Sequence, residues 1–309
     1  MNGPGSVSNE SMRIGVDLGG TKIEAIALDE KGDILARRRV STPAGDYEAI
    51  LRAIGVLVHE LEYETNRRGS VGVGGPGELS AHSGLIRGSN TAVVNDKALD
   101  ADLSALLGRP VRFENDANCF ALSEAVDGAG VGARVVFGVI LGTGVGGGVV
   151  IDGQIVAGRN HIAGEWGHTP LPWMTRGEFP GRRCFCGHDG CIETFLCGPA
   201  LMRDYAERSG GQASGREIAL RARQGEAAAQ AALDAYQNRL ARALAMMVNI
   251  LDPDTIVLGG GVSNIAQLYN GLEAKVATHA FTDALDTKIR RNAHGDSSGV
   301  RGAAWLWRA

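Results

Sequence analysis

One histidine and three cysteines have the residue types and the close spacing of a metal site. They are His168, Cys184, Cys186 and Cys191. Three soft thiolates and one imidazole match the tetrahedral ligand set that zinc prefers. The chain has five cysteines, and an odd number with three of them clustered favours reduced thiolates over disulfides. Because four protein ligands leave no open position for a water, we expect a structural zinc ion rather than a catalytic one.

Three glycine-rich turns predict a nucleotide site. The turn in residues 17–22 joins two strand-like runs, which argues against the Rossmann fingerprint, and it lacks the Walker A spacing. Each turn alone is more often a tight turn than a phosphate site. Together, with backbone N–H groups that glycine leaves accessible, they favour a triphosphate held from two sides. The candidate residues are Asp17, Gly19, Gly20, Thr21, Lys22, Gly142, Thr143, Gly144, Gly260 and Gly261.

Asp116 is the candidate catalytic residue. It lies between a strand-like run and a helix predicted from about Cys119. An aspartate or asparagine here could instead be only the N-cap of that helix. The flanking Asn115 and Asn118, together with the glycine turns, favour a catalytic role. In phosphoryl transfer a carboxylate suffices as base, provided that the attacking hydroxyl loses its proton late.

Two glutamates flank the cysteine cluster. Glu165 precedes His168, and Glu193 follows the last cysteine. Their carboxylates and the imidazole match the dense array of hydroxyl groups on a sugar, whereas surface exposure without a ligand is the alternative. We expect the three side chains to bind sugar hydroxyls, and the metal to fix the loop 164–193 that carries them.

A repeated strand pattern would position these residues. Residues 13–40 predict three strands around the first glycine turn. The pattern recurs as a strand over 135–141, a glycine turn over 142–148, and strands over 149–151 and 154–157. Two such meanders, each followed by helices, predict a duplicated α/β fold with a cleft between the copies.

Apolar side chains at helical spacing predict the main helices. One begins after Asp46, the expected N-cap, and a long alanine-rich helix covers 226–251 and ends before Pro253. Another is expected from about Ser263. A short helix over 299–307 is expected to return to the first domain.

The composition is that of an ordinary globular protein. The chain has 309 residues, of which 44% are hydrophobic and 21% charged, and its net charge is −4. This balance argues against nucleic-acid and membrane partners, and no apolar run approaches the ~20 residues of a bilayer span. Residues 1–11 lack a signal-peptide pattern and are expected to form a disordered leader. With the reduced thiolates, this favours a cytoplasmic location.

In its motifs the sequence resembles the ROK family of sugar kinases and repressors. The motifs are Asp17-Leu-Gly-Gly-Thr-Lys22, Glu114-Asn-Asp-Ala-Asn118, Leu141-Gly-Thr-Gly144, Gly164-Glu-Trp-Gly-His168 and the cysteine cluster. The resemblance covers about residues 12–307. It implies the actin-like (hexokinase/Hsp70-type) ATPase fold, with ATP and Mg²⁺ between two α/β domains. The implied domains span 12–118 and 119–294, and a helix over about 295–309 returns to the first.

The resemblance also implies roles for individual residues. The family's catalytic base falls on Asp116, and its zinc ligands fall on His168 and the three clustered cysteines. His168 would then bind the metal through one ring nitrogen and the sugar through the other. The implied sugar contacts are Pro76, Asn90, Asn115, Glu165, His168 and Glu193.

Within the family, different segments favour different sugars. Residues 165–173 and 294–307 look most like bacterial fructokinases or manno(fructo)kinases, so the expected reaction is phosphorylation of the 6-hydroxyl of fructose, with mannose as a further substrate. Residues 115–124 and 141–148 are equally similar to N-acetylglucosamine kinases, and the family also contains glucokinases.

A sugar-sensing ROK repressor is the alternative from another class of protein. Its helix-turn-helix would precede the first phosphate strand, and here that strand begins at about residue 13. The basic footprint of a DNA-binding protein is missing as well. The resemblance implies a homodimer.

Overall fold

The computed structural model describes residues 12–43 and 45–308, so the expected leader lies outside the described residues. Two compact units are formed, and the chain passes between them more than once. The first unit contains the chain up to Asp127, residues 157–163 and the chain from Asp296; the second contains 128–156 and 164–295. Within the described residues, no helix is both long and apolar enough to cross a bilayer.

The first unit is built on a five-stranded sheet with the order β3-β2-β1-β4-β7. The strands are β1 (Met12–Leu18), β2 (Lys22–Leu28), β3 (Ile34–Ser41), β4 (Gly69–Gly75) and β7 (Val111–Asn115). The first three pair antiparallel, as the sequence predicts, whereas β4 and β7 continue the sheet in parallel with β1. A two-stranded ribbon, β5 (Glu78–Leu79) with β6 (Ile86–Arg87), and a 3₁₀ turn, η1 (Ala92–Val94), lie between β4 and β7 in the chain.

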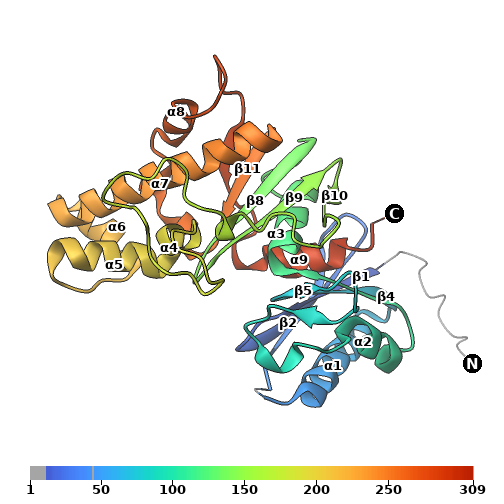
Figure 1. Ribbon diagram of the computed structural model, residues 1–309. Helices are drawn as coiled ribbons and strands as arrows, with labels where there is room; N and C mark the ends of the chain where they lie inside the picture. The colour runs from blue at the N-terminus through green and yellow to red at the C-terminus, as the bar shows by residue number, and fades with distance from the viewer. Residues whose placement is uncertain (1–11, 44, 309) are drawn as a thin grey trace, which may run out of the picture. The chain divides into compact units, whose positions relative to one another are not determined.

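Helices cover both faces of this sheet. They are α1 (Tyr47–Thr65), α2 (Leu99–Leu107), α3 (Asp116–Val126) and α9 (Ser298–Trp305). In Figure 1, α1 and α2 lie below the sheet, and α3 and α9 lie above it. The predicted cap of α1 is confirmed, because the Asp46 carboxylate accepts a hydrogen bond from Ala49 N at 2.9 Å.

The C-terminal helix α9 returns to the first unit, where it packs against α3, β1 and β4. It approaches the sheet so closely that a Cβ at Gly72 would lie 1.9 Å from the carbonyl oxygen of Ala303. Only glycine permits this contact. Because α3 packs against α9, it belongs to the first unit, which therefore ends near Asp127 instead of at the expected residue 118.

The second unit repeats the topology of the first. Its sheet has the order β10-β9-β8-β11-β12, formed by β8 (Val135–Leu141), β9 (Val145–Ile151), β10 (Gln154–Ile155), β11 (Thr255–Gly259) and β12 (Lys288–Arg291). Again three strands pair antiparallel and two pair parallel. The predicted duplication is confirmed, but β9 begins at Val145, so most of the expected glycine turn is strand.

The helices of the second unit pack around the long helix α7. The α-helices are α4 (Glu193–Leu196), α5 (Gly198–Ser209), α6 (Gly215–Arg223), α7 (Ala227–Leu251) and α8 (Leu272–Ala277). The 3₁₀ turns of this unit are η2 (Trp166–His168), η3 (Gly261–Asn264) and η4 (Ala266–Tyr269), and η5 (Gly295–Ser297) lies where the chain returns to the first unit. The prediction of a helix from about Ser263 is wrong, because the chain there forms the two 3₁₀ turns η3 and η4 before α8 begins. The predicted end of α7 is confirmed, with Asp252 as its left-handed cap (φ 46°).

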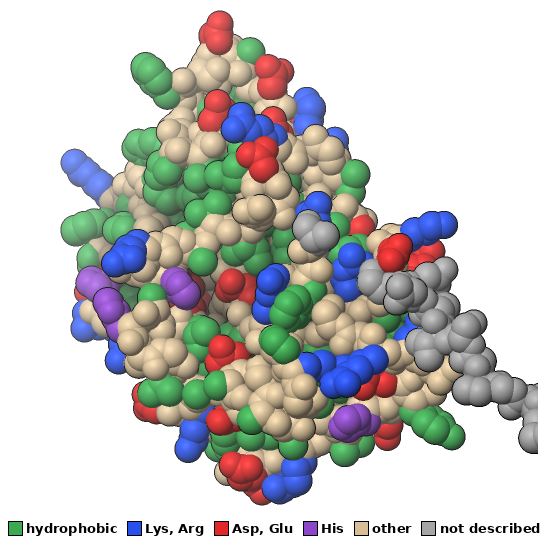
Figure 2. Space-filling model, turned by 90° about the vertical axis from the view of Figure 1, so that its right-hand side faces the viewer, with side chains coloured by type: hydrophobic (Ala, Val, Ile, Leu, Met, Phe, Trp, Pro, Cys, Tyr) green, Lys and Arg blue, Asp and Glu red, His purple; other side chains and the backbone are tan. Residues whose placement is uncertain are grey.

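Basic and acidic side chains are interspersed on the face shown in Figure 2. No broad basic patch appears there. This distribution agrees with the net charge of −4.

Candidate functional site

The expected site residues of the first unit gather at one edge of its sheet. Since β1, β4 and β7 run in parallel, their carboxyl ends meet at the same edge. The Asn115 amide donates a hydrogen bond to the carbonyl of Gly77 at 3.2 Å, which ties the end of β7 to the turn that follows Pro76. A Cβ at Gly77 would lie 2.8 Å from Ser89 N, so the segment that carries Asn90 is adjacent as well.

Asp116 is the first residue of α3, which begins three residues earlier than predicted. The helix cap is Asn115, whose side-chain oxygen accepts a hydrogen bond from Ala117 N at 2.8 Å. The alternative reading of Asp116 as the cap is therefore wrong. Its side chain is exposed, and Oδ1 also accepts from Ala117 N at 2.8 Å. Asn118 is buried and donates to Glu114 Oε1 at 3.0 Å, so it supports the helix start.

Asp17 lies close enough to Asp116 for their charges to interact. Burial, and then the charges of Asp116 and Glu24, raise the pKa of Asp17 to about 7, although the charges of Lys22 and Arg39 act in the opposite direction. Two neighbouring carboxylates that repel each other are a suitable environment for a divalent cation. These residues therefore fit Mg²⁺ with its preference for oxygen ligands.

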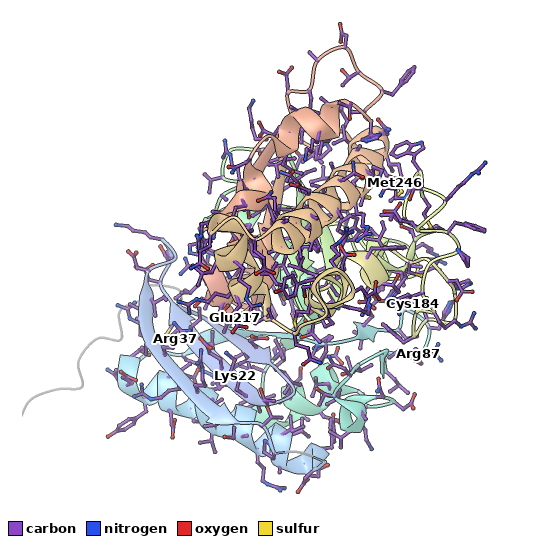
Figure 3. The ribbon with its side chains drawn as sticks, turned by 90° about the vertical axis from the view of Figure 1, so that its left-hand side faces the viewer. Lys22, Arg37, Arg87, Cys184, Glu217 and Met246 are labelled. Atoms are coloured by element: carbon purple, nitrogen blue, oxygen red, sulfur yellow. The ribbon has the colours of Figure 1, made fainter. Side chains whose placement is uncertain are left out.

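Basic side chains lie on β2 and β3, the strands that continue the sheet from β1. Figure 3 labels Lys22 on β2 and Arg37 on β3. The buried Glu24 forms ion pairs with both Arg37 and Arg39. Lys22 itself begins β2 at the end of the first glycine turn, where an ammonium group can neutralise a bound phosphate.

In the second unit, the four expected metal ligands come together. Their ligand atoms all lie within 4.8 Å of one another. The sulfurs of Cys186 and Cys191 are 3.5 Å apart, and Cys184 Sγ is 3.6 Å from His168 Nδ1. A tetrahedral zinc ion with Zn–S bonds of about 2.3 Å needs sulfur–sulfur separations of about 3.8 Å. The side chains therefore fit a zinc ion.

Backbone pairing brings these ligands into place. Pro170 and Cys191 form an antiparallel bridge, which places His168 and Cys191 on adjoining segments. Trp166 anchors the histidine turn, because its ring is buried and its Nε1 donates to Gly146 O at 3.0 Å. Cys184 lies in the long loop before α4, as Figure 3 shows.

The two flanking glutamates each lie close to a residue of this cluster. His168 Nε2 lies 3.8 Å from Glu165 Oε2, too far for a hydrogen bond, so both groups keep capacity for a ligand. Glu193 Oε1 lies 3.9 Å from Cys184 Sγ, and its Oε2 accepts a hydrogen bond from Val145 N at 3.0 Å. A Cβ at Gly144 would lie 2.6 Å from that oxygen, which explains the glycine. Glu193 thus connects the cluster to the second glycine turn.

The second and third glycine turns border one cavity of about 480 Å³. The Gly142 carbonyl accepts a hydrogen bond from Gly198 N at 2.7 Å, which joins the second turn to α5. The pocket lies between these turns and the starts of α5 and α6. Its lining residues are Gly142, Thr143, Gly198, Pro199, Met202, Gly215, Arg216, Gly261, Val262 and Ile265. Such a mainly apolar slot beside glycine turns fits a flat nucleobase.

The sequence did not predict most of this pocket. Met202 and Arg216 lie on ordinary amphipathic helices, and no motif marks them. The only available signal was the Gly198-Pro199 pair, which is typical of the start of a helix and here places α5 against the second glycine turn.

The chain is similar to known proteins over nearly its whole length. The ROK family model matches residues 13–309. The N-acetyl-D-glucosamine kinase of Photobacterium profundum is 42% identical over 96% of this chain and 99% of that protein. Among solved structures, the ROK hexokinase of Thermus thermophilus is 32% identical, with a TM-score of 0.84 over 95% of this chain and 96% of that one.

A second solved structure contains a nucleotide analogue. The ROK glucokinase of Streptomyces griseus, in complex with glucose and AMPPNP, is 28% identical with a TM-score of 0.76, over 96% of this chain and 99% of that one. The 42% identical relative is an N-acetyl-D-glucosamine kinase, whereas the sequence motifs predict a fructokinase. The fold is that of the actin-like ATPases, and the chain belongs to the ROK family, among its sugar kinases.

Proposed function

We propose that this protein transfers the γ-phosphoryl group of ATP to the 6-hydroxyl of N-acetyl-D-glucosamine. The observation that carries the choice of sugar is the identity of 42% with an N-acetyl-D-glucosamine kinase over nearly its whole length. The proposed chemistry is supported by Asp116, an exposed carboxylate at the start of α3 beside Asp17.

In this proposal Asp116 orients the attacking 6-hydroxyl and accepts its proton. The carboxylate is a weak base, so it takes the proton as the new bond to phosphorus forms. Asn115 holds the carboxylate in place by capping α3. When bound with ATP, Mg²⁺ neutralises charge on the phosphate oxygens. The Asp17 carboxylate would attract this cation through its negative charge.

The nucleotide would be held by both sets of glycine turns. Lys22, Gly19, Gly20 and Thr21 would bind phosphate oxygens through an ammonium group, a hydroxyl and backbone N–H groups. Gly142, Thr143 and Gly144 would do the same from the second unit. The base would occupy the 480 Å³ pocket, with Gly260 and Gly261 at one side of it.

The sugar would be held by the polar side chains around the metal cluster. Glu165 and His168 are partly exposed, with side-chain exposures of 41% and 26%, and both retain hydrogen-bonding capacity. Glu193, Asn115, Pro76 and Asn90 complete the proposed set. Zinc would fix the orientation of His168 by binding its Nδ1, leaving Nε2 for a sugar hydroxyl.

A panel of sugars tests the proposed substrate. We expect kcat/KM for N-acetylglucosamine to exceed that for fructose, mannose and glucose by about 10-fold or more, because a pocket that accommodates the acetamido group gains contacts which the other sugars lack. Coupled detection of ADP release measures each value. A higher kcat/KM for fructose would contradict the choice of N-acetylglucosamine and restore the reading drawn from the sequence.

Loss of the metal should weaken sugar binding more than ATP binding. We expect Cys184→Ser to lose bound zinc, to lower the Tm by several degrees, and to raise the KM for sugar about 10-fold or more, because the metal orients the sugar-binding loop. Mass spectrometry of bound zinc, thermal unfolding and steady-state kinetics measure these effects. Cys197→Ser, at a buried cysteine outside the cluster, is the matched control and should keep its zinc. A zinc-free Cys184→Ser with the wild-type KM would refute the coupling.

A further inference from the structure

Thr91 carries a buried hydroxyl that the protein itself does not use. Its Oγ1 is buried and has no hydrogen-bond partner among residues 12–43 and 45–308. The backbone on either side is well held, since Thr91 N donates to Ser89 Oγ at 3.1 Å and Thr91 O accepts from Val94 N at 3.0 Å. The backbone of Thr91 is therefore fixed, while its side-chain hydroxyl has no hydrogen-bond partner among the described residues.

The loop that carries Thr91 is held by a second set of hydrogen bonds. The Asn95 side chain accepts from Ser89 N and donates to Ser89 O, both at 2.9 Å. These two hydrogen bonds connect the two ends of the segment 89–95, which follows β6 and contains η1. Thr91 lies inside it, directly after Asn90.

The Thr91 hydroxyl faces the first glycine turn. A methyl group at Gly20 would lie 3.6 Å from Thr91 Oγ1. The turn is itself fixed, because Gly19 N donates to Lys22 O at 3.0 Å and Thr42 Oγ1 donates to Gly19 O at 2.7 Å. Two threonines therefore approach the same turn, and only the hydroxyl of Thr42 has a partner within it.

We propose that the Thr91 hydroxyl donates a hydrogen bond to the γ-phosphoryl group of the nucleotide. This inference rests on the proposed kinase function and adds a residue that no motif identified. A threonine hydroxyl offers one donor, and charge in phosphoryl transfer is spread over the peripheral oxygens of the transferring group. A buried hydroxyl without a partner destabilises the free protein, and a ligand oxygen at the glycine turn would satisfy it.

The nearly isosteric variant Thr91→Val removes the hydroxyl and keeps the shape. We expect kcat at saturating sugar and MgATP to fall about 10–100-fold, with the KM for sugar within about twofold of wild type. Thr91→Ser, which keeps the donor, should retain most of the activity. The Tm of Thr91→Val should equal or exceed that of wild type, because no protein hydrogen bond is lost.

Thr42→Val is the matched control for stability. It removes a hydroxyl of the same kind from the same turn, but one that is hydrogen-bonded, so its Tm should fall by about 2 °C or more. Equal decreases in Tm for Thr91→Val and Thr42→Val would mean that Thr91 has a structural role, and would overturn the proposal.

Binding of nucleotides tests the contact without relying on turnover. Calorimetry should give a Kd for AMPPNP that is about 10-fold higher in Thr91→Val than in wild type, while the Kd for ADP is unchanged because ADP lacks the γ-phosphate. An equal change for both nucleotides, or a change only in the KM for sugar, would overturn the proposal. Absence of turnover in wild type with every sugar would refute the proposed function instead, and the two Kd values would still decide the role of Thr91.

Discussion

Asp116→Asn should lower kcat by about 10²–10⁴-fold, the range that a positioned general base contributes. Asparagine keeps the size of the side chain and can still accept from Ala117 N, as Asp116 Oδ1 does at 2.8 Å. What it loses is the ability to take the proton of the sugar hydroxyl. The KM for N-acetylglucosamine should change little, because asparagine can still accept a hydrogen bond from the 6-hydroxyl and the other proposed sugar contacts are unchanged.

The control for this variant is Asp283→Asn, at an exposed carboxylate in the loop after α8. It makes the same chemical change without touching the site and should keep the wild-type kcat. The Tm of Asp116→Asn should stay within a few degrees of wild type, since the residue is exposed and Asn115 provides the cap. If Asp116→Asn keeps more than about a tenth of the activity, Asp116 is not the base.

Asp17→Asn should abolish most of the activity and at the same time stabilise the protein at pH 8. Burial, and then the charges of Asp116 and Glu24, raise the pKa of Asp17 from 3.8 to about 7. At pH 8 the Asp17 carboxylate is therefore ionised in the folded protein, and its charge destabilises the fold. A pKa shift of this size means that the charged Asp17 carboxylate destabilises the folded state by about 4 kcal/mol. Asparagine removes this charge, but burying its amide group also costs free energy, so the net gain in stability is smaller. We expect the free energy of unfolding to rise by about 2–4 kcal/mol.

The pH dependence of this gain has a definite sign. A carboxyl group whose pKa is higher in the folded state stabilises the fold fully below its unfolded pKa, and this contribution is lost as the pH rises through the folded value. For Asp17 the loss falls between about pH 4 and pH 7. The stability advantage of Asp17→Asn should therefore be largest at pH 8 and disappear toward pH 4.

Urea unfolding of wild type and Asp17→Asn at several pH values, in buffer without added magnesium, measures this difference. Magnesium is left out because a bound cation would favour the ionised carboxylate. A constant difference between pH 4 and pH 8, or a destabilised Asp17→Asn at pH 8, would show that the charge of Asp17 is not the source of the effect. The same comparison for Asp283→Asn should give no pH-dependent gain.

Strand periodicity and motif order were enough to predict the duplicated fold. Two differences between the prediction and the structure have the same cause, a contact between segments that are distant in the chain. The sequence predicts a glycine turn that includes residues 146–148, but these glycines lie in β9. A Cβ at Gly147 would lie 2.6 Å from the ring of Trp166. This glycine is thus required by side-chain packing across the strand, which a one-dimensional pattern does not reveal.

The first unit ends near Asp127 and not at the predicted residue 118 for a similar reason. The N-terminal half of α3 carries the motif around Asp116, but the helix packs against α9 near the C-terminus. Ser298 Oγ on α9 donates a hydrogen bond to Glu124 Oε1 on α3 at 2.8 Å, across a separation of 174 residues. Nothing in either segment alone indicates this pairing. The helix predicted from about Ser263 is absent for a local reason. The chain forms two 3₁₀ turns there, and α8 begins only after its N-cap, Gly271.

The site was predicted best where chemistry constrains residue type. Zinc demands thiolates and imidazole, so His168 and the three cysteines could be identified from spacing alone, and the structure brings them together. The proposed base pocket constrains residue type less, because many small or apolar side chains can form its wall. Met202 and Ile265 therefore left no signature in the sequence. The homodimer stays a prediction.

The central claim is that the protein moves a phosphoryl group from ATP to the 6-hydroxyl of N-acetylglucosamine. The most direct measurement is ³¹P and ¹³C NMR of the product formed from ATP and this sugar. The account predicts N-acetylglucosamine 6-phosphate in equal amount to the ADP released, with the phosphorus coupled to C6. ADP released without a phosphorylated sugar, or phosphate attached at another carbon, would contradict it.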